Sequence, residues 1–303
     1  SVQKMILSND KESRKKAIME LLPYQKNDFY KILKTMAPMP VTIRLLDPPL
    51  HEFLPSQKNT QLIDSLADSM GITAKTIINR IIDLFEINPM LGHRGCRLAI
   101  SYPEITEMQA EAILTATARL IKEGEKPNPE IMIPLISNVN EFNHQKLLIQ
   151  KIATKIENKL KLKINYKIGT MIELPRACLT ADTIAENADF FSFGTNDLTQ
   201  TTFGFSRDDI GSFIQDYFDN DILIEDPFKT LDKNGVGLLI KLAVEKGRGV
   251  DKNLKIGICG EHGGDPKSIE FCNDIGLNYV SCSPYRIPIA RLSAAKNSIK
   301  LNV

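Results

Sequence analysis

Apolar positions in this chain come in two patterns that alternate along the sequence. Short β-branched and aromatic runs predict strands, and segments with apolar residues three or four positions apart predict helices. The predicted strands lie at about 41–47, 130–136, 166–173, 188–194, 254–259 and 278–282. The predicted helices lie at about 60–70, 73–85, 103–124, 139–160, 176–187, 235–247, 266–275 and from 287 onwards. Strands that alternate with helices in this way predict a parallel α/β sheet or barrel.

The parts of the chain outside this alternation are expected to be helical or irregular. Residues 1–37 predict helices, one capped by Asn9-Asp10 and one by Asn27-Asp28. A helical excursion follows the first strand and ends in a glycine-flanked basic loop at residues 88–97, and residues 204–235 are loop-rich and acidic. We expect one domain over 1–303, with a helical lead-in at 1–37 and the barrel remainder at 38–303.

Composition narrows the class of protein. The 303 residues are 43% hydrophobic and 25% charged, which is typical of a globular fold. Lys and Arg total 38 against 37 Asp and Glu, a balance that indicates no nucleic-acid or membrane partner. No apolar run approaches the roughly 20 residues of a membrane helix. Five cysteines without a C-x-x-C pair, and no targeting pattern, predict a reduced cytoplasmic compartment.

Three of the predicted strands end in groups that can carry chemistry. Glu173 follows one strand, Cys259 ends another and is followed by Gly260, and Gly194-Thr195-Asn196-Asp197 ends the strand between them. The carboxyl ends of parallel strands lie at one face of a sheet or barrel. The sequence therefore predicts one active site that contains these residues.

The residue types leave several chemistries open. Glu173 and Asp197 would suit Mg²⁺, which binds one or two carboxylates together with substrate oxygens, but each could instead cap the helix that follows. Cys259 could act as a nucleophile or as a general acid, or could be a buried apolar side chain. His262 lies close enough in the sequence to allow a Cys–His pair.

Arginines follow several of the same segments. Arg44 directly follows the Val-Thr-Ile run of the first strand, Arg94 and Arg97 lie in the basic loop, and Arg207 comes after the Asn-Asp stretch. Several arginines at one site would bind phosphate or carboxylate, although a single arginine is more often part of a surface ion pair. The chain contains no glycine-rich nucleotide-binding motif, so we expect no nucleotide-binding fold within it.

Four stretches resemble the phosphoenolpyruvate/pyruvate-binding domain of the PEP-utilising enzyme family. They are residues 42–55, 88–98, 194–209 and 259–266, in family order. Phosphoenolpyruvate synthase and enzyme I of the sugar phosphotransferase system are similar in the Gly-Thr-Asn-Asp and Cys-Gly-Glu stretches. The Leu-Asp-Pro-Pro-Leu-His-Glu-Phe run is similar to the pyruvate phosphate dikinases.

The resemblance implies a fold and a reaction. The fold is a (β/α)₈ TIM-type barrel, here N-terminally truncated, because the first two strands and one phosphate-binding arginine of the family have no match. The reaction is a Mg²⁺-dependent phosphoryl transfer between phosphoenolpyruvate or pyruvate and a phosphohistidine on a separate domain. In the dikinases it forms part of ATP + pyruvate + phosphate = AMP + phosphoenolpyruvate + diphosphate. The histidine-bearing and ATP-binding domains have no match in this chain, and the family implies a homodimer.

The resemblance also implies roles for individual residues. The metal ligands, which also contact substrate, are Glu173 and Asp197. The other substrate-binding residues are Arg44, Arg94, Gly194, Thr195, Asn196 and Arg207. Cys259 matches the acid that protonates C3 of enolpyruvate.

Two other functions stay open at this point. One is a Mg²⁺-enolate lyase or aldolase that acts on pyruvate; the Arg44–Arg94 pair favours a phosphorylated substrate over this alternative. The other is a non-catalytic dimerisation module, which would not bind phosphoenolpyruvate in the presence of Mg²⁺.

Overall fold

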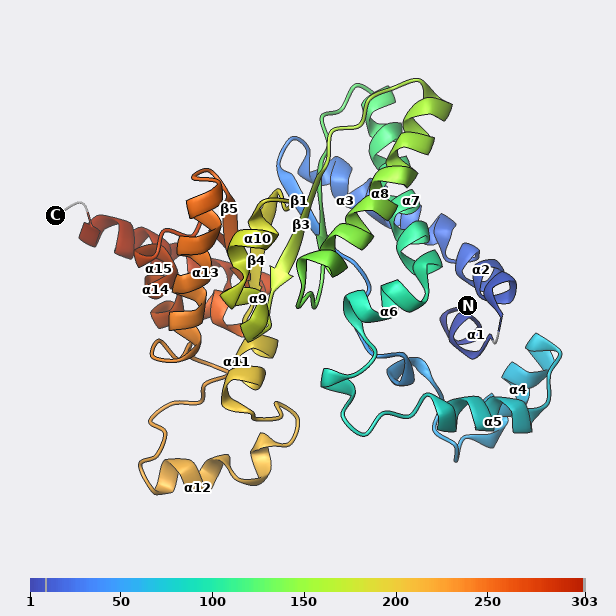
Figure 1. Ribbon diagram of the computed structural model, residues 1–303, viewed down its shortest axis with the longest axis horizontal. Coiled ribbons are helices and arrows are strands. Elements are labelled where there is room, and N and C mark those ends of the chain that lie inside the picture. Colours follow the sequence, from blue (N-terminus) through green and yellow to red (C-terminus); the bar gives the residue numbers. More distant parts are fainter. Residues whose placement is uncertain (9, 302–303) are drawn as a thin grey trace. The chain divides into compact units, whose positions relative to one another are not determined.

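Strands and helices alternate along the chain in the computed structural model, which describes residues 1–8 and 10–301 (Figure 1). The strands are β1 Pro40–Arg44, β2 Asn128–Ile133, β3 Lys167–Ile172, β4 Phe190–Gly194, β5 Lys255–Cys259 and β6 Tyr279–Val280. The strands pair in parallel, β1 with β2, β3 with β4, β4 with β5 and β5 with β6. No helix among the described residues is long and apolar enough to cross a membrane.

Helices connect and precede these strands. The α-helices are α1 Val2–Leu7, α2 Lys11–Met19, α3 Leu22–Met36, α4 Thr60–Met70, α5 Ala74–Asp83, α6 Gly95–Ser101, α7 Pro103–Lys122, α8 Val139–Leu160, α9 Pro175–Leu179, α10 Ala181–Ala185, α11 Thr195–Phe203, α12 Ile214–Asp219, α13 Val236–Val250, α14 Pro266–Asp274 and α15 Ile287–Leu301. Single 3₁₀ turns are η1 Leu50–Phe53, η2 Pro89–Leu91, η3 Ile210–Ser212, η4 Glu261–Gly264 and η5 Pro284–Arg286.

The chain forms two compact units. The first unit contains Ser1–Pro134 and Asn143–Lys167, and the second contains Leu135–Phe142 and Ile168–Val303. Each unit contains parallel strands connected through helices.

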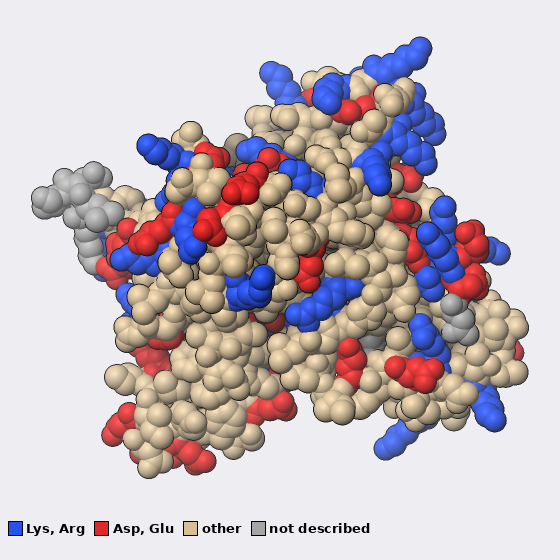
Figure 2. All heavy atoms as spheres, viewed as in Figure 1, with Lys and Arg blue, Asp and Glu red and all other residues tan. Residues whose placement is uncertain are grey.

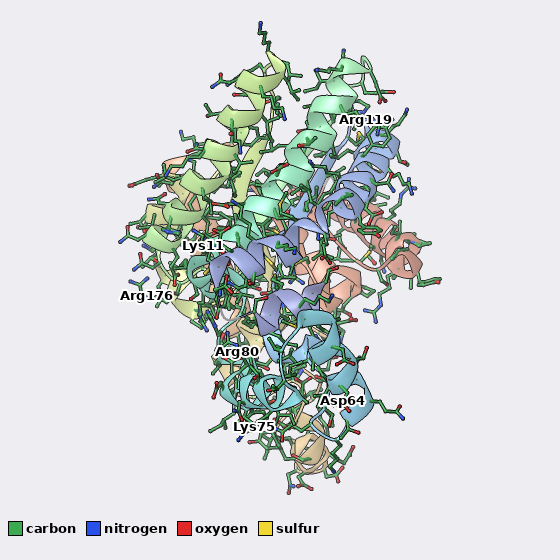
Figure 3. All side chains as sticks on the ribbon, turned by 90° about the vertical axis from the view of Figure 1, so that its right-hand side faces the viewer. Lys11, Asp64, Lys75, Arg80, Arg119 and Arg176 are labelled. Carbon is green, nitrogen blue, oxygen red and sulfur yellow. The ribbon has the colours of Figure 1, made fainter. Side chains whose placement is uncertain are left out.

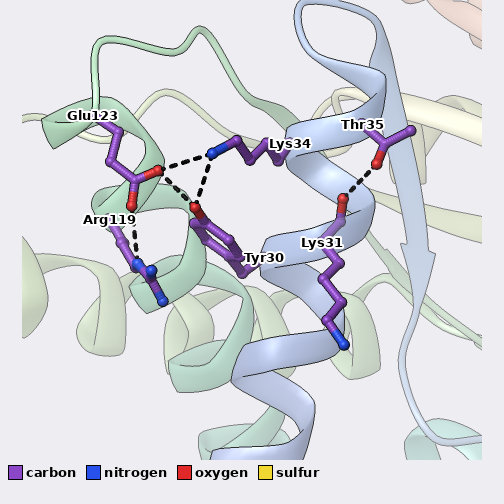
Figure 4. A network of polar contacts seen from close by, with 6 residues as sticks. All are labelled: Tyr30, Lys31, Lys34, Thr35, Arg119 and Glu123. Atoms are coloured by element: carbon purple, nitrogen blue, oxygen red, sulfur yellow. Dashed lines mark hydrogen bonds and ion pairs between the residues drawn. The ribbon is translucent and has the colours of Figure 1, made fainter.

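In the first unit, β1 pairs with β2, so that Ile43 lies opposite Ile131. Helix α3 packs on α7 through buried Leu33, Ala116 and Leu120. A polar network covers the edge of this contact, and Figure 4 shows it. The Tyr30 hydroxyl donates a hydrogen bond to Glu123 Oε2 at 2.6 Å and accepts one from Lys34. Arg119 donates to the other oxygen of Glu123. The guanidinium of Arg119 also lies 4.0 Å from the centre of the Tyr30 ring.

Helices α4 and α5 form the excursion predicted between the first two strands. Their apolar faces bury Ile63, Leu66, Ile77 and Ile81 against Leu7 of α1. Charged side chains, among them Asp64, Lys75 and Arg80, project from these two helices in Figure 3. The helices start where expected from capping chemistry, since Asn59 and Thr73 each accept a hydrogen bond from the first helical turn.

In the second unit, β3, β4, β5 and β6 pair in succession. The interior is built on apolar strand residues that are fully buried, namely Phe190, Phe191, Phe193, Ile256 and Ile258. Helix α13 packs against α9, α10 and α11. Strands with a continuous apolar run are typical of a parallel sheet that is covered on both faces.

The predicted fold class is confirmed. The described residues form an α/β fold in which parallel strands follow one another in chain order with helices between them, as in a TIM-type barrel, with six strands instead of eight. The helical lead-in and the helical excursion are both present. The single-domain assignment of 1–303 stays a prediction.

Three local predictions were wrong. Asn27 and Asp28 lie inside α3, which starts at Leu22 with a proline in its first turn. The helix predicted at 176–187 is interrupted at Thr180 and forms α9 and α10. The basic loop at 88–97 instead contains η2 and the start of α6. The cap predicted at Asn9-Asp10 is formed by Asp10, whose side chain accepts from Ser13 N at 2.8 Å, and Asn9 lies outside the described residues.

The segment predicted to be loop-rich and acidic is so in the structure. Residues 204–235 contain only η3 and the short helix α12 among the described elements. Figure 2 shows carboxylates at the surface of the α12 region. An aromatic cluster holds this segment together, since Phe205 contacts Phe203, Phe213 and Tyr217.

Candidate active site

The carboxyl ends of β3, β4 and β5 carry the predicted site residues of the second unit. Glu173 directly follows β3, Gly194 ends β4 and Cys259 ends β5. In the parallel register Ile172 lies opposite Phe193, and Gly194 lies opposite Cys259. The pleat and the register therefore bring these three residues together, as the sequence predicted.

Glu173 is held in a tight backbone cradle. Its side chain is buried, with 1% of its surface exposed, and Oε1 accepts a hydrogen bond from the backbone N–H of Leu135 at 2.5 Å. A Cβ atom placed on Gly194 would lie 2.4 Å from Glu173 Oε2. Position 194 therefore needs glycine, because any other residue would displace this carboxylate.

Leu135 shows that the cradle is built at a cost in backbone energy. It has a φ of 58°, in the left-handed region that leucine rarely adopts. Such a conformation costs roughly 1–3 kcal/mol and is found mostly where surrounding structure fixes it at functional sites. Sequence reasoning missed Leu135, because nothing in the apolar run that ends at this position signals a positive φ.

Asp197 and Asn196 lie in the first turn of α11, immediately after β4. Asp197 is buried, with 9% of its surface exposed, and the N-terminal end of the helix stabilises its negative charge. The Oδ1 atom of Asn196 is buried and has no hydrogen-bond partner among the described residues. The turn thus carries a buried amide oxygen next to Asp197 in the sequence.

This set of oxygens fits a magnesium ion. Mg²⁺ typically takes one or two protein carboxylates and completes its shell with water and substrate oxygens. Glu173 and Asp197 can supply the carboxylates from two adjacent strand ends. Among the described residues no group of three or more His, Cys, Asp and Glu side chains could hold a metal, so a cation at Glu173 and Asp197 would need further oxygens from the substrate or water.

Cys259 lies half-buried beside the start of α11. Its Sγ lies 3.5 Å from the Phe193 carbonyl oxygen. Gly260 follows with a φ of 97°, and a Cβ there would lie 3.4 Å from Asn196 Oδ1 and 3.5 Å from Thr195 Oγ1. The Cys259–Gly260 turn therefore packs directly on the Thr195–Asn196 turn.

His262 does not pair with Cys259. Its Nδ1 lies 2.7 Å from Thr195 Oγ1, its Nε2 lies 3.0 Å from the Pro227 carbonyl oxygen, and the ring is fully buried. Burial lowers the pKa of His262 below its usual 6.5. Because both ring nitrogens bind other groups, the Cys–His nucleophilic pair considered from the sequence was wrong.

Three of the remaining four cysteines are buried. Cys96, Cys178 and Cys272 are buried, and burial raises the pKa of the Cys178 and Cys272 thiols to about 12. Cys282 is half-buried, like Cys259. Cys259 is thus the half-buried cysteine that lies at the candidate site.

In the first unit, Arg44 and Arg94 converge on one carboxylate. Arg94 Nη2 lies 2.6 Å from Asp47 Oδ2, and both side chains are about 5% exposed. Arg44 Nη1 lies 3.2 Å from the same oxygen, with 45% of its side chain exposed. Sequence reasoning missed Asp47, although its position three residues after Arg44 allows the two side chains to form an ion pair. The pair of guanidinium groups is suited to an anion such as a phosphoryl group.

Arg97 and Arg207 have other surroundings. Arg97 lies inside α6, and its Nη1 donates to the carbonyl oxygens of Leu91 at 2.7 Å and Gly92 at 3.0 Å, so it braces the η2 turn. Arg207 has an exposed side chain, and its backbone N–H donates to Gln200 Oε1 at 2.9 Å. The structure gives Arg207 no contact with the other predicted site residues.

The fold and these residues define a class of protein. Residues 3–299 match the family described as PEP-utilising enzyme, PEP-binding domain, and the chain belongs to this family. Among curated proteins it is 55% identical over 296 residues to the chloroplastic pyruvate, phosphate dikinase of Mesembryanthemum crystallinum. It is 52% identical over 299 residues to the pyruvate, phosphate dikinase of Clostridium symbiosum.

These alignments cover 98% of this chain but only 31% and 34% of the two relatives. The chain thus spans about a third of the length of the curated relatives that it matches. The resemblance to the dikinases seen in the sequence is confirmed, and the similarity concerns the PEP-binding part of these enzymes.

Proposed function

We propose that this chain binds phosphoenolpyruvate and pyruvate and catalyses the Mg²⁺-dependent phosphoryl transfer between them and a phosphohistidine on a separate domain. The overall reaction would be that of a pyruvate phosphate dikinase. The observation that supports this most is that the Glu173 carboxylate occupies the space that a side chain at position 194 would fill. Cys259 lies opposite Gly194 on the neighbouring strand. The family match and the dikinase relatives agree with it.

The reaction has two steps. In the direction of pyruvate formation, the P–O bond of phosphoenolpyruvate breaks, a P–N bond forms to histidine of the partner domain, and the enolate of pyruvate is left. The C3 carbon of the enolate then takes the thiol proton of Cys259, which leaves a thiolate and pyruvate. Reversal of both steps forms phosphoenolpyruvate from phosphohistidine and pyruvate.

The residues of the second unit supply orientation and a proton. Glu173 and Asp197 would hold Mg²⁺, which when bound neutralises developing negative charge on oxygen. The Asn196 amide oxygen, at the same turn as Asp197, is buried without a hydrogen-bond partner among the described residues and would accept one from a bound ligand. Cys259 can donate its proton only if the thiol stays protonated, and its Sγ lies 3.5 Å from the Phe193 carbonyl oxygen, a neutral hydrogen-bond acceptor.

The arginines of the first unit would bind the phosphoryl group. Asp47 holds the guanidinium groups of Arg44 and Arg94 near one point, and Arg44 is exposed enough to turn to an incoming anion. Each charged hydrogen bond to the transferred group is worth about 1.5–3 kcal/mol. Arg207, also predicted to bind substrate, would act from an exposed segment.

The same site chemistry would serve phosphoenolpyruvate synthase or enzyme I of the phosphotransferase system, which differ in the phosphate donor. The dikinase reaction is favoured because the relatives at 52–55% identity are dikinases. The homodimer and the cytoplasmic location stay predictions.

The partial reaction of this chain tests the proposal. Enolisation of pyruvate requires the metal acids and Cys259 but neither ATP nor phosphohistidine. We expect the chain with Mg²⁺ to exchange the methyl protons of pyruvate with D₂O, measured by proton NMR, and Cys259→Ala to lack this exchange. The proposal fails if both proteins incorporate deuterium at the same rate, or if neither does.

A further inference from the structure

We propose that His262 is a positioning residue that fixes the Cys259–Gly260 turn against the start of α11 through the hydroxyl of Thr195. The inference deepens the proposed function, since it concerns how the proton donor is held. It is carried by the hydrogen bonds of a fully buried ring.

The partners of His262 define its tautomer. The Pro227 carbonyl oxygen, 3.0 Å from Nε2, can only accept a hydrogen bond, so Nε2 carries a proton. The lowered pKa of the buried ring keeps it neutral, so Nδ1 has no proton. Nδ1 therefore accepts from the hydroxyl of Thr195, 2.7 Å away.

This hydrogen bond fixes the orientation of the Thr195 hydroxyl. Thr195 is fully buried, and its Oγ1 also lies 3.3 Å from the carbonyl oxygen of Cys259. One hydroxyl carries one hydrogen, and the shorter contact to Nδ1 takes it. Thr195 thus uses its side chain within the protein and would contact substrate only through its backbone, at the first turn of α11.

The chain of contacts ties three segments of the second unit together. Pro227 lies at the return of the acidic segment, His262 lies in η4 after β5, and Thr195 opens α11 after β4. Gly260, with its φ of 97°, packs on Thr195 and Asn196 at 3.4–3.5 Å from where its Cβ would be. The hydrogen bond between Thr195 and His262 is one of the contacts that hold the turn carrying Cys259, so loss of the Thr195 hydroxyl should loosen this turn.

The test compares Thr195→Val, which removes the hydroxyl at nearly constant shape, with Thr195→Ser, which keeps it. His262→Gln serves as a second variant. A glutamine amide can donate to the Pro227 carbonyl oxygen but lacks the second ring nitrogen that accepts from Thr195. The first readout is the rate at which iodoacetamide alkylates each cysteine of the 303-residue chain, measured by mass spectrometry. Cys282 is also half-buried and is the internal reference.

We expect Cys259 to react about threefold faster or more in Thr195→Val and His262→Gln, because a buried hydrogen bond that orders its turn is lost. Cys282 should keep its rate, and Thr195→Ser should match the wild type. The inference is overturned if Cys259 and Cys282 accelerate together, which indicates general loosening. It is overturned as well if Cys259 keeps its rate in both variants.

The second readout connects the position of Cys259 to chemistry. Pyruvate deuterium exchange should fall about tenfold or more in Thr195→Val, because a misplaced proton donor costs rate, while Mg²⁺-dependent oxalate affinity stays within about threefold. Unchanged exchange with a faster-reacting Cys259 would overturn the catalytic part of the inference. If Cys259 responds as expected but the wild type shows no exchange, the proposed function fails and the positioning of the turn by His262 stands.

Discussion

The arginines of the first unit and the carboxylates of the second unit are both partly or fully buried charges, but different forces hold them. Glu173 is positioned by backbone, through the N–H of Leu135 and the missing side chain of Gly194. Arg94 is positioned by another side chain, the carboxylate of Asp47. A site held by backbone is rigid and specific in shape, whereas a site held by an ion pair is rearranged when another anion competes.

This difference fits the chemistry proposed for each cluster. A metal site needs fixed oxygen positions, since Mg²⁺ demands near-octahedral geometry. A phosphoryl group that leaves in every cycle needs cations that can return to an internal partner, and Asp47 is such a partner for Arg44 and Arg94.

Asp47→Ala should give the largest loss of stability. It removes the carboxylate that lies 2.6 Å from the guanidinium of Arg94, which is only 5% exposed, and removal of one member of a buried ion pair costs about 3–5 kcal/mol. Urea unfolding of the variant and the wild type measures this. A loss below about 1 kcal/mol would mean that the pair behaves like a surface ion pair and that Asp47 does not hold Arg94.

Arg94→Ala should weaken phosphoenolpyruvate binding by about 1.5–3 kcal/mol for each charged hydrogen bond lost. Arg97→Ala is the matched control, three residues away, whose guanidinium donates to Leu91 and Gly92 carbonyl oxygens. Arg97→Ala should weaken phosphoenolpyruvate binding much less. Calorimetric titration with Mg²⁺ present compares them, after thermal unfolding has shown that both variants fold. Equal losses would contradict the assignment of the phosphoryl group to Arg94.

His262 should make stability depend on pH. Its pKa is lowered in the folded protein, so the unfolded chain binds more protons below pH 6.5. The stabilising contribution is fully present above that pH and is lost as the pH falls, by at most about 1.4 kcal/mol per pH unit. His262→Gln should have a flatter curve between pH 7 and pH 5 in urea unfolding. Parallel curves for the two proteins would show that His262 is protonated equally in both states.

The polar network on α3 and α7 should contribute least. Tyr30, Lys34, Arg119 and Glu123 form it at the surface, where water and salt screen the charges (Figure 4). Glu123→Gln should change the unfolding free energy by no more than the roughly 10–15% uncertainty of the denaturant extrapolation. A larger decrease in the unfolding free energy that disappears at 1 M salt would show that this network helps to hold α3 on α7.

Much of the fold was predictable because local patterns and tertiary packing agree. The apolar runs that became β3, β4 and β5 and the periodic segments that became α4, α7 and α8 were placed to within a few residues. The start of α3 was missed because Pro23 in the first turn outweighs Asn27-Asp28 as a helix start. The start of α6 at Gly95 was hidden by the glycines and charges that indicated a loop.

The placement of the candidate residues was predictable where a residue follows an apolar strand run, as for Glu173, Asp197 and Cys259. It was not predictable where a residue acts through a partner far away in the sequence. Thr195 and His262 are 67 residues apart, and Arg94 and Asp47 are 47 apart. No periodicity or spacing connects such pairs. Leu135 was missed for a related reason, since its positive φ is imposed by surrounding structure.

The most direct test of the contrast between the two clusters is a titration of two ligands against two variants. Oxalate resembles the enolate of pyruvate but lacks a phosphoryl group, and phosphoenolpyruvate has one. With Mg²⁺ present, Arg44→Ala should weaken the affinity for phosphoenolpyruvate by about tenfold or more, because the phosphoryl group engages the arginines. The affinity for oxalate should stay within about threefold. Asp197→Asn should abolish the Mg²⁺-dependent binding of both. Equal weakening of the two ligands by Arg44→Ala, or tight Mg²⁺-dependent binding retained by Asp197→Asn, would contradict the account.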